Sequence, residues 1–326
     1  LASQTSEHTP QLPRTDETMY TELARQRAVE AARRADWGKA PPPVADFEEL
    51  FGFPPTALQR RVAALAGPVK APSLVLIEAP TGSGKTEAAL YLAHQWLSHG
   101  RQAGVYLALP TQATSAAMHE RLCAYPGLPD SPLCHAGTPG SPAARLLEGT
   151  GVGTVDQALL AVLSDQQAWV RLLGLANKIV ILDEVHAYDA YTSGLLGRLL
   201  QWLAALNCSV IMLSATLPEA QRSELLRAYG AMAAPTQIAY PRVTLATGTY
   251  EEVAPLPATS QRRVHLRHLA SQGNLLCELL SHLDGGGCAA VVCNTVGGAQ
   301  AMYRRLQRET SGAGVALSLV HGRYPQ

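Results

Sequence analysis

The chain has 326 residues, of which 47% are hydrophobic and 16% are charged, and its formal net charge at pH 7 is zero. This length favours two domains that each bury a core, and the composition is typical of a soluble globular protein rather than a disordered one. A neutral chain has no overall attraction for nucleic acid or for an anionic membrane, so contacts with nucleic acid must depend on local groups. No apolar run approaches the ~18 residues of a membrane span.

The six cysteines show neither a C-x-x-C pair nor the spacing of a zinc site. Cys208 and Cys288 border apolar runs, which predicts reduced, buried thiols at both positions. The chain starts with LASQTSEHTP, which has no Met and no signal-like apolar core. We therefore expect a cytoplasmic protein with no membrane partner, and we expect the chain to be a fragment of a longer one.

Residues 1–45 combine a polar start with a helical pattern over residues 17–36. Charges of both signs occur in that pattern, which is typical of a solvated helix face; an arm that binds nucleic acid is the alternative. Pro41, Pro42 and Pro43 then interrupt the chain and indicate a linker.

From Phe47 onward, strand patterns alternate with helix patterns, which predicts a parallel sheet covered by helices on both faces. The expected strands are Ser73–Ala79, Gly104–Pro110, the start of VGTVDQALLAVL, Ile179–Leu182 and Ser209–Thr216. The expected helices are Thr86–Ser98, Ala113–Ala124, Tyr191–Leu206 and one that begins at Pro218. We assign this first domain to residues 46–234.

Residues 235–262 show little periodicity and are interpreted as the connection between two domains. A second unit of similar pattern is predicted over residues 263–326. Its expected elements are a helix over His268–Leu283, a strand over Ala289–Cys293, a helix over Gly297–Thr310 and a strand at VALSLVH. Two or three strands are too few for a complete domain of this type.

A phosphate-binding loop is predicted directly after the first of these strands, in EAPTGSGKTEAAL. The glycines let the backbone curl so that its N–H groups point at phosphate oxygens. Lys85 can reach the β and γ phosphates of a nucleotide, and Thr86 offers its hydroxyl to Mg²⁺ at a helix N-terminus. Ala79 stands where the motif has its first glycine, a substitution that is ordinary in helicase-type loops. A chance turn is the alternative to a phosphate-binding loop. The candidate ATP-binding residues here are Ala79, Pro80, Thr81, Gly82, Ser83, Gly84, Lys85 and Thr86.

Two carboxylates, Asp183 and Glu184, follow directly on the apolar strand pattern of residues 178–182. A buried carboxylate is costly unless it is paired or coordinates a metal. We predict that Asp183 holds the Mg²⁺ shell and that Glu184 orients or deprotonates the attacking water. Acidic pairs also occur on solvated loops, so it is the pair and the loop together that predict NTP binding and hydrolysis.

The stretch DEVH at residues 183–186, with Ser214-Ala215-Thr216 after the next strand, resembles a DExH helicase of superfamily 2. The resemblance implies an α/β P-loop NTPase fold with a RecA-like parallel sheet, followed by an incomplete second RecA-like domain. It implies that Gln59, at the end of FGFPPTALQ, reads the adenine, and that Ser214, Ala215 and Thr216 couple ATP to movement. His186 has no Cys/His cluster around it, which favours a catalytic polar link to Ser214 or Thr216 over a metal ligand.

Three further segments resemble, in order, the parts of these helicases that lie on the nucleic-acid backbone: ALPTQATS, GTVDQAL and CNTVGGAQ. Hydroxyl and amide groups at strand ends suit sequence-independent phosphate contacts. Alone, the first could be only a helix cap, Thr154 only a turn, and Gln59 only part of a helix surface. The implied nucleic-acid-binding residues are Pro110, Thr111, Gln112, Thr154, Gln157, Asn294 and Thr295.

The longer string DEVHAYDAYTSGLL, with VGTVDQALLAVL before it and MLSATLP after it, resembles the helicase portion of the type I CRISPR-associated helicase–nuclease. The resemblance covers about residues 47–323. It implies ATP and Mg²⁺ as cofactors, the displaced single-stranded DNA as substrate, and recruitment to a guide-RNA surveillance complex (Cascade-like). That family degrades the strand with an HD nuclease domain; no His-Asp cluster occurs upstream here, so we expect the nuclease elsewhere, in cis or in trans.

The arginine-bearing motifs that this family has late in its second domain find no match in the sequence. An arginine finger is worth ~10³–10⁵-fold in the rate of related phosphoryl transfers, so we expect this chain to bind ATP but to hydrolyse it poorly. Two alternatives stay open: a generic DExH helicase acting on RNA or in DNA repair, and a regulatory P-loop module that binds nucleotide without moving on nucleic acid.

Overall fold

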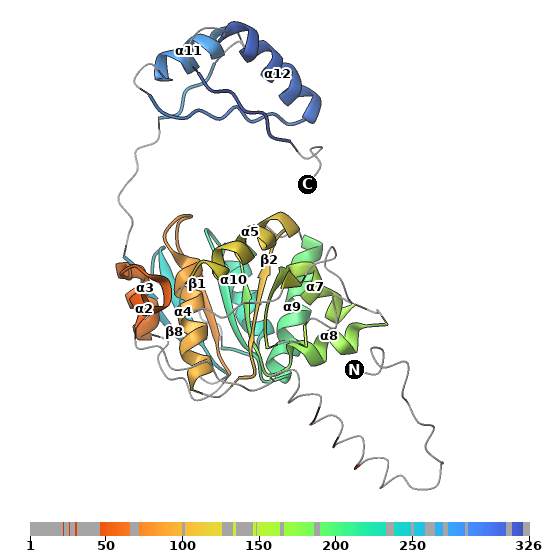
Figure 1. The fold of residues 1–326 in the computed structure, drawn as a ribbon. Coiled ribbons are helices and arrows are strands. Elements are labelled where there is room, and N and C mark those ends of the chain that lie inside the picture. The colour runs from red at the N-terminus through yellow and green to blue at the C-terminus, as the bar shows by residue number, and fades with distance from the viewer. Residues whose placement is uncertain are drawn as a thin grey trace. The chain divides into compact units, whose positions relative to one another are not determined.

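A computed structural model of the chain describes most of the region from residue 46 onward (Figure 1). The described residues are Glu22, Gln26, Glu30, and residues 46–65, 72–99, 102–125, 133–134, 146–147, 149–163, 166–185, 190–232, 238–248, 251–257, 265–269, 273–283, 286–310 and 315–321. Glu22, Gln26 and Glu30 are helical and exposed, as the solvated-face interpretation predicts. The predicted linker at residues 41–43 lies outside the described residues.

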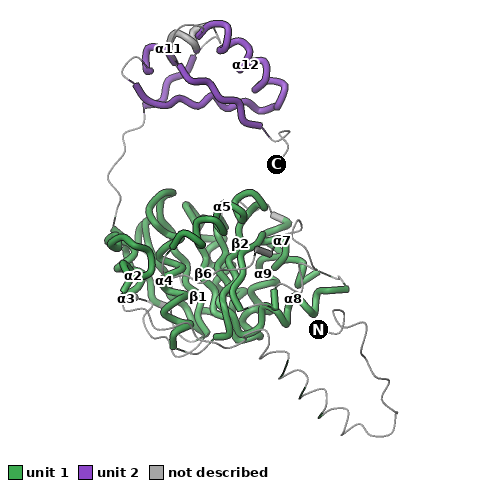
Figure 2. Tube along the Cα trace, viewed as in Figure 1, with its two compact units in different colours: residues 1–260 green, residues 261–326 purple. Residues whose placement is uncertain are grey.

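The chain forms two compact units, residues 1–260 and residues 261–326 (Figure 2). The first unit is built on an eight-stranded sheet with the order β3-β4-β2-β5-β6-β1-β7-β8. Its strands are β1 (Leu74–Glu78), β2 (Val105–Leu109), β3 (Leu133–Cys134), β4 (Thr150–Thr154), β5 (Ile179–Leu182), β6 (Ser209–Ser214), β7 (Arg242–Ala246) and β8 (Glu251–Pro255). The pairings among β1–β6 are parallel, which confirms the predicted α/β fold.

Strands β7 and β8 correct the prediction that residues 235–262 only connect two domains. They form an antiparallel pair, and β7 also pairs antiparallel with β1, so both belong to the sheet of the first unit. The strand pattern was obscured because two of the buried residues of β7, Arg242 and Thr244, are polar. Burial of such residues is tolerated only where partners satisfy them, and those partners lie on β1 and on the helix α10 (Glu219–Ala228).

Helices cover both faces of this sheet (Figure 1). One face packs against α2 (Phe47–Phe51), α3 (Ala57–Leu65), α4 (Lys85–Ser98) and α5 (Gln112–Cys123). The other face packs against α7 (Val155–Leu159), the short 3-10 helix η2 (Leu160–Val162), α8 (Ala168–Leu175), α9 (Ala190–Ala205) and α10 (Glu219–Ala228). Because both faces are buried, β1, β5 and β6 are apolar at nearly every position, as central strands of a parallel sheet require.

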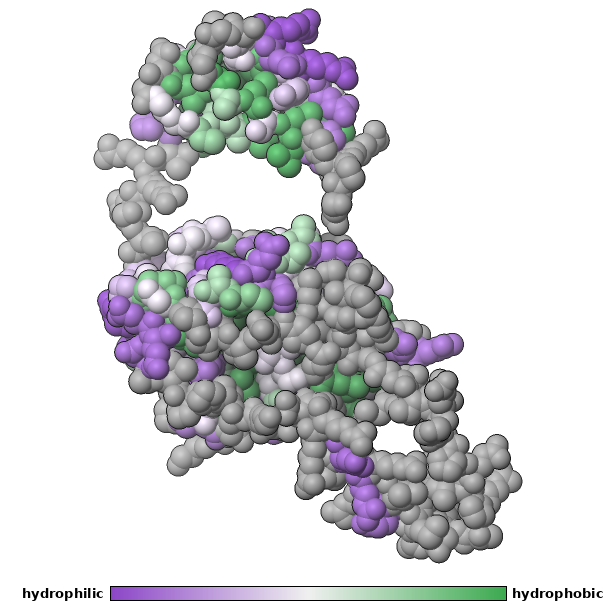
Figure 3. All heavy atoms as spheres, in the orientation of Figure 1, coloured by the Kyte–Doolittle hydropathy of each residue, from purple (hydrophilic) through white to green (hydrophobic). Residues whose placement is uncertain are grey.

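The second unit contains α11 (Gly273–Leu283) and α12 (Val296–Glu309), close to the two helices predicted there. The predicted strands at residues 289–293 and 315–321 are not formed, because these segments have no strand ladder to a neighbour among the described residues. None of the described residues of this unit is buried, and Figure 3 shows apolar side chains gathered on its visible face. Leu266, Val292 and Val320 are among the exposed ones, and Cys288 is exposed where a buried thiol was predicted.

Cys208, in contrast, is buried as predicted. None of the helices that the structure describes is long and apolar enough to cross a membrane. Within the same residues, no group of three or more His, Cys, Asp and Glu side chains is placed to hold a metal ion.

Candidate functional site

Apart from Gln59 on α3, the predicted site residues of the first unit follow the carboxyl ends of parallel strands, and these ends meet at one edge of the sheet. Glu78 at the end of β1 pairs with Ser214 at the end of β6. Leu109 at the end of β2 pairs with Thr154 at the end of β4. This edge is where open α/β sheets bind their ligands, because the chain turns from strand to helix there.

The predicted phosphate loop runs from Ala79 to Gly84 and leads directly into α4. Gly82 and Gly84 have φ angles of 76° and 85°, a region that glycine adopts without strain. The amide of Ser83 donates to the carbonyl of Pro80 at 3.2 Å, which closes the turn. The loop therefore brings backbone N–H groups to the N-terminus of a 14-residue helix, an arrangement that attracts anions.

Lys85 lies inside this loop. Its Nζ donates to the carbonyl oxygens of Ala79 at 2.7 Å and Pro80 at 3.0 Å. Burial lowers the pKa of Lys85, while the charges of Asp183 and Glu184 act in the opposite direction. The two acidic residues predicted from the sequence are thus near enough to this ammonium group to influence it, although they come from a different strand.

Ser83 carries a polar atom that the loop itself does not satisfy. Its hydroxyl is buried and has no hydrogen-bond partner among the described residues. Buried hydroxyls in folded proteins are nearly always paired, so an unpaired one in a loop of this shape indicates a ligand that accepts hydrogen bonds. Thr86, the proposed Mg²⁺ contact, lies in the first turn of α4 and is partly exposed, while Thr81 is exposed.

Gln59 is joined to the same loop. Its side chain is 2% exposed, its Nε2 donates to the carbonyl of Gly84 at 3.2 Å, and its Oε1 accepts from the amide of Thr56 at 2.7 Å. The structure therefore excludes the alternative that Gln59 belongs to a solvated helix surface. It places the glutamine on the phosphate loop, and its contact with adenine stays a prediction.

Asp183 and Glu184 follow β5 directly, and Glu184 has an unusual backbone conformation. Asp183 is buried, its amide donates to the carbonyl of Ala108 at 3.0 Å, and its Oδ1 accepts from the amide of Glu184 at 2.8 Å. Glu184 has a φ of 55°, which costs energy for a side-chain-bearing residue. Such strain concentrates at functional sites, where it fixes the direction of a side chain. His186, the fourth predicted catalytic residue, lies outside the described residues.

The coupling segment contacts the phosphate loop through its main chain. The carbonyl of Ser214 accepts from the amide of Ala79 at 3.1 Å, and the Ser214 hydroxyl donates to the carbonyl of Thr216 at 2.8 Å. Ser214 is fully buried, whereas Ala215 is partly exposed and Thr216 is exposed. The structure thus brings this predicted segment directly against the first residue of the loop.

The predicted nucleic-acid residues of the first unit differ in exposure. Thr111 and Gln112 are exposed, and Thr111 caps α5 in a reciprocal arrangement with Thr114. A cap can also contact a phosphate, so the nucleic-acid contact of Thr111 stays a prediction. Thr154 is buried, and its carbonyl accepts from the Tyr106 hydroxyl at 2.9 Å.

Four further residues were predicted to bind nucleic acid: Pro110 and Gln157 of the first unit, and Asn294 and Thr295 of the second. Pro110 is partly exposed. The Oε1 atom of Gln157 is buried and has no hydrogen-bond partner in the described part of the chain. Asn294 and Thr295 are exposed, and Thr295 caps α12 by accepting from the amide of Gly298 at 3.0 Å. All seven predicted residues therefore lie at strand ends or helix starts.

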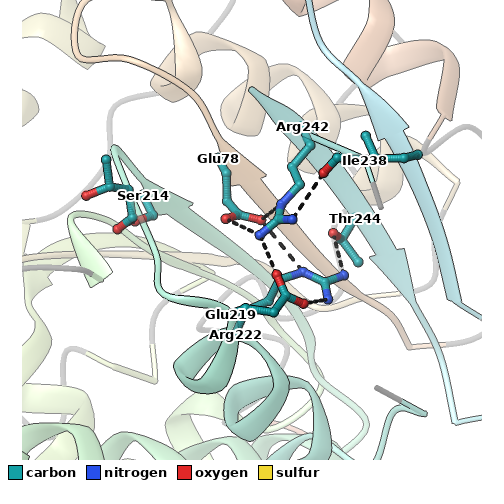
Figure 4. Close-up of polar contacts among 8 residues, drawn as sticks. Glu78, Ser214, Glu219, Arg222, Ile238, Arg242 and Thr244 are labelled. Carbon is teal, nitrogen blue, oxygen red and sulfur yellow. Dashed lines mark hydrogen bonds and ion pairs between the residues drawn. The ribbon is translucent and has the colours of Figure 1, made fainter. Parts of the chain in front are cut away.

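An ionic network that was not predicted from the sequence lies at the end of β1, directly before the loop (Figure 4). Glu78, the last residue of β1, is bound by Arg242 of β7 and approached by Arg222 of α10. The one signal in the sequence was a glutamate that ends an apolar strand directly before the loop motif. Its two arginine partners are 144 and 164 residues away along the chain, so no local pattern could identify them.

A second missed contact lies at the start of α4. Glu87 is buried and forms an ion pair with Arg121 of α5, and its Oε1 accepts from the Tyr125 hydroxyl at 3.0 Å. Arg121 also donates to that hydroxyl at 2.8 Å. This trio joins the helix that begins at the loop to the helix that Thr111 caps.

A family model described as DEAD/DEAH box helicase matches residues 56–224, which include Gln59, the loop, the acidic pair and the coupling segment. The chain belongs to this family. A curated relative, the CRISPR-associated endonuclease/helicase Cas3 of Thermus thermophilus, is 38% identical over 92% of this chain and 36% of its own length.

Two solved structures agree with this relationship. The structure of T. fusca Cas3-AMPPNP matches with a TM-score of 0.73 and 32% identity over 93% of this chain and 40% of that one. A chain of the "CRISPR RNA-guided surveillance complex, pre-nicking" matches with a TM-score of 0.61 and 32% identity over 79% of this chain and 32% of that one. The chain thus spans well under half the length of these relatives.

Proposed function

We propose that this chain is the ATP-driven motor of a CRISPR interference enzyme, which moves along single-stranded DNA. The observation that carries the proposal is the convergence of the loop, the acidic pair and Ser214 at one edge of the sheet. Similarity to Cas3 helicases over most of the chain supports it. The solved relative bound to AMPPNP supports ATP as the nucleotide.

The phosphates of ATP are proposed to lie over the loop, where Lys85 and Ser83 receive them. Lys85 gives up its bonds to the Ala79 and Pro80 carbonyls and donates to phosphate oxygens instead. The unpaired Ser83 hydroxyl gains an acceptor. Each of these contacts replaces an interaction already in place or satisfies a missing one, so nucleotide binding requires little rearrangement of the backbone.

Thr86 and Asp183 are the residues proposed to hold Mg²⁺. Their hydroxyl and carboxylate oxygens are the ligands that this cation prefers, and Asp183 is a buried carboxylate within electrostatic range of Lys85. When bound, Mg²⁺ neutralises charge that develops on the phosphates. Glu184, fixed by its strained backbone, accepts a proton from the attacking water or orients that water.

Single-stranded DNA is proposed to contact Pro110, Thr111, Gln112, Thr154 and Gln157 of the first unit and Asn294 and Thr295 of the second. Hydroxyls, amides and helix starts recognise phosphates without reading bases, which fits a motor on any sequence. We further propose a guide-RNA surveillance complex as partner, a nuclease acting in cis or in trans, and a cytoplasmic location. The solved surveillance complex that contains a relative supports the first of these.

Calorimetric titration of the chain with Mg²⁺-AMPPNP, with and without a single-stranded DNA oligonucleotide, tests the proposal. A motor must couple its two ligands, so DNA should change the nucleotide affinity severalfold. An equal effect from RNA would favour a generic helicase. A nucleotide affinity that neither DNA nor RNA changes would indicate a regulatory P-loop module and contradict the proposal.

A further inference from the structure

We propose that Glu78, Glu219, Arg222 and Arg242 form a positioning network that holds the phosphate loop in register with α10. The inference deepens the proposed function and rests on it, because it names residues that set the geometry of the same nucleotide site. None of the four side chains is proposed to touch the phosphates. They act through the backbone that leads into the loop.

The centre of the network is the carboxylate of Glu78, which is 1% exposed. Its Oε2 accepts from Arg242 Nε at 2.7 Å and its Oε1 accepts from Arg242 Nη2 at 3.0 Å, so the pair is bidentate. Arg222 Nε lies 3.7 Å from the same Oε2. The two residues Glu78 and Arg242 also face each other in the register of β1 and β7.

Glu219, in the first turn of α10, joins the two arginines (Figure 4). Its Oε1 accepts from Arg222 Nη1 at 3.0 Å and its Oε2 accepts from Arg242 Nη2 at 2.9 Å. Two bonds to uncharged groups complete the arrangement: Arg222 Nη2 donates to Thr244 Oγ1 at 3.1 Å, and Arg242 Nη1 donates to the carbonyl of Ile238 at 3.2 Å. Two guanidinium groups balance two carboxylates, which makes their burial tolerable.

The pKa of Arg242 is consistent with its hydrogen bonds to the two carboxylates. The hydrogen bonds and charge of Glu78, together with those of Glu219, raise the pKa of Arg242 although its burial lowers it. Arg242 therefore keeps its positive charge at the centre of this arrangement. Removing one member of such a cluster leaves a buried charge unpaired, so the remaining groups must move or admit water.

The side chain of Glu78 points away from the helix that follows the loop. Alternate residues of β1 face opposite sides: Val75 and Ile77 pack with the α4 side, and Leu74 and Leu76 pack with the α10 side. Glu78 continues the second set, which agrees with its contact to Arg222. Its carboxylate therefore lies on the far side of the sheet from α4, and it positions the loop without contacting a ligand there.

The backbone connects the network to the loop in one step. Ala79 follows Glu78, its amide donates to the Ser214 carbonyl, and its own carbonyl accepts from Lys85 Nζ. On the other side, α10 follows the coupling segment with only Leu217 and Pro218 between. A shift of α10 would thus be transmitted through Glu219 and Arg222 to Glu78, and from there to the carbonyl that holds Lys85.

The mildest probes are Glu219→Gln and Thr244→Val. Glu219 is the most exposed member of the network, with a side chain that is 42% exposed. Thr244→Val removes one hydrogen bond of Arg222, and valine has nearly the same shape as the threonine that it replaces. Glu224→Gln is the matched control, because Glu224 is exposed on the same helix and outside the network. Leu226→Ala, in the core of α10, controls for general destabilisation of that helix.

The experiment measures hydrogen exchange of the amides of Ala79 and residues 82–85 in the full chain without nucleotide, and then the affinity for Mg²⁺-ADP. Loss of a network bond should speed exchange of these amides by about fivefold or more and weaken ADP binding by a similar factor. Glu224→Gln should change neither, and Leu226→Ala should lower the melting temperature without selective exchange at the loop.

The outcomes separate the two proposals. Unchanged loop exchange and ADP affinity in both probes, in a chain that binds ADP, would overturn the network's positioning role and leave the motor intact. Equal loop exchange in Leu226→Ala and Glu219→Gln would overturn it as well, because the effect would then be general loosening. Selective exchange in the probes, in a chain that binds no ADP, would support positioning and contradict the proposed function.

Discussion

Lys85 donates a hydrogen bond of 2.7 Å to the carbonyl of Ala79, six residues before it, so the cation proposed for the phosphates is held within its own loop. Lys85→Ala should therefore weaken nucleotide binding more than it alters the fold. A charge-assisted hydrogen bond contributes about 1.5–3 kcal/mol, which predicts a loss of roughly 10- to 100-fold in affinity for Mg²⁺-ADP. Calorimetry provides the measurement, and an unchanged dissociation constant would show that Lys85 does not contact the phosphates.

Glu184→Gln should separate chemistry from binding. The amide keeps the size of the side chain but cannot take a proton from water, so single-turnover hydrolysis of ATP should fall by at least ~100-fold, the low end of general-base catalysis. Affinity for Mg²⁺-AMPPNP should stay within about twofold, well below the tenfold that 1.4 kcal/mol produces. If Glu184→Gln weakens binding as much as Lys85→Ala does, the water-activation role is wrongly assigned.

Gly84 should tolerate a side chain less well than Gly82. Both have positive φ, and alanine in that region costs ~1–2 kcal/mol. A Cβ on Gly84 would in addition lie 2.5 Å from Nε2 of Gln59, whereas a Cβ on Gly82 meets nothing within 4 Å.

Thermal unfolding should thus show a larger loss for Gly84→Ala than for Gly82→Ala. The extra loss should shrink when Gln59→Ala is added, because the clash is then removed. Equal losses from the two glycine variants, with no effect of Gln59→Ala, would show that Gln59 does not pack on the loop.

The free energy of unfolding should fall at high pH because Cys208 is buried. Burial raises the pKa of its thiol to about 11 from an ordinary value of 9.0. The folded state keeps this proton while the unfolded state loses it, so the stabilisation is complete below pH 9 and disappears as the pH rises towards about 11. Tyr229, whose hydroxyl donates to the Cys208 carbonyl at 2.6 Å and whose pKa burial also raises, acts in the same direction.

Denaturant unfolding between pH 8 and pH 11 checks this effect. The free energy of unfolding should decline more steeply with pH in the parent chain than in Cys208→Ala. Parallel curves for the two would show that the thiol is not protected. As an independent control, the exposed thiols Cys123 and Cys288 should react with an alkylating reagent in the folded chain, and Cys208 should not.

The sequence predicted most of the first unit because its strands and helices are locally encoded. Apolar runs mark β1, β5 and β6, and the loop motif carries its own backbone geometry in two glycines. Strand β7 was not predicted because two of its five buried side chains, Arg242 and Thr244, are polar. Their partners come from distant segments, and only the folded sheet brings them together.

In the candidate site, too, local motifs could be predicted from the sequence, whereas contacts between distant segments could not. The order of motifs predicted which segments meet at the sheet edge, since parallel strands end on one side. The order of motifs could not show that Gln59 donates a hydrogen bond to Gly84 or that Glu184 has a strained backbone. Nor could it show that Glu78 lies between two arginines. In the second unit, the helices were predicted from their periodicity, whereas the apolar segments at residues 289–293 and 315–321 do not form strands within the described residues.

The proposed role as a DNA-stimulated ATPase motor is tested most directly by the rate at which the chain hydrolyses ATP with Mg²⁺, with and without single-stranded DNA. We predict a rate that stays low overall, because the sequence has no match to the arginine-bearing motifs, but that rises severalfold with DNA, falls to background in Glu184→Gln and requires Lys85. A rate that DNA does not change, or one that survives Glu184→Gln, would contradict it.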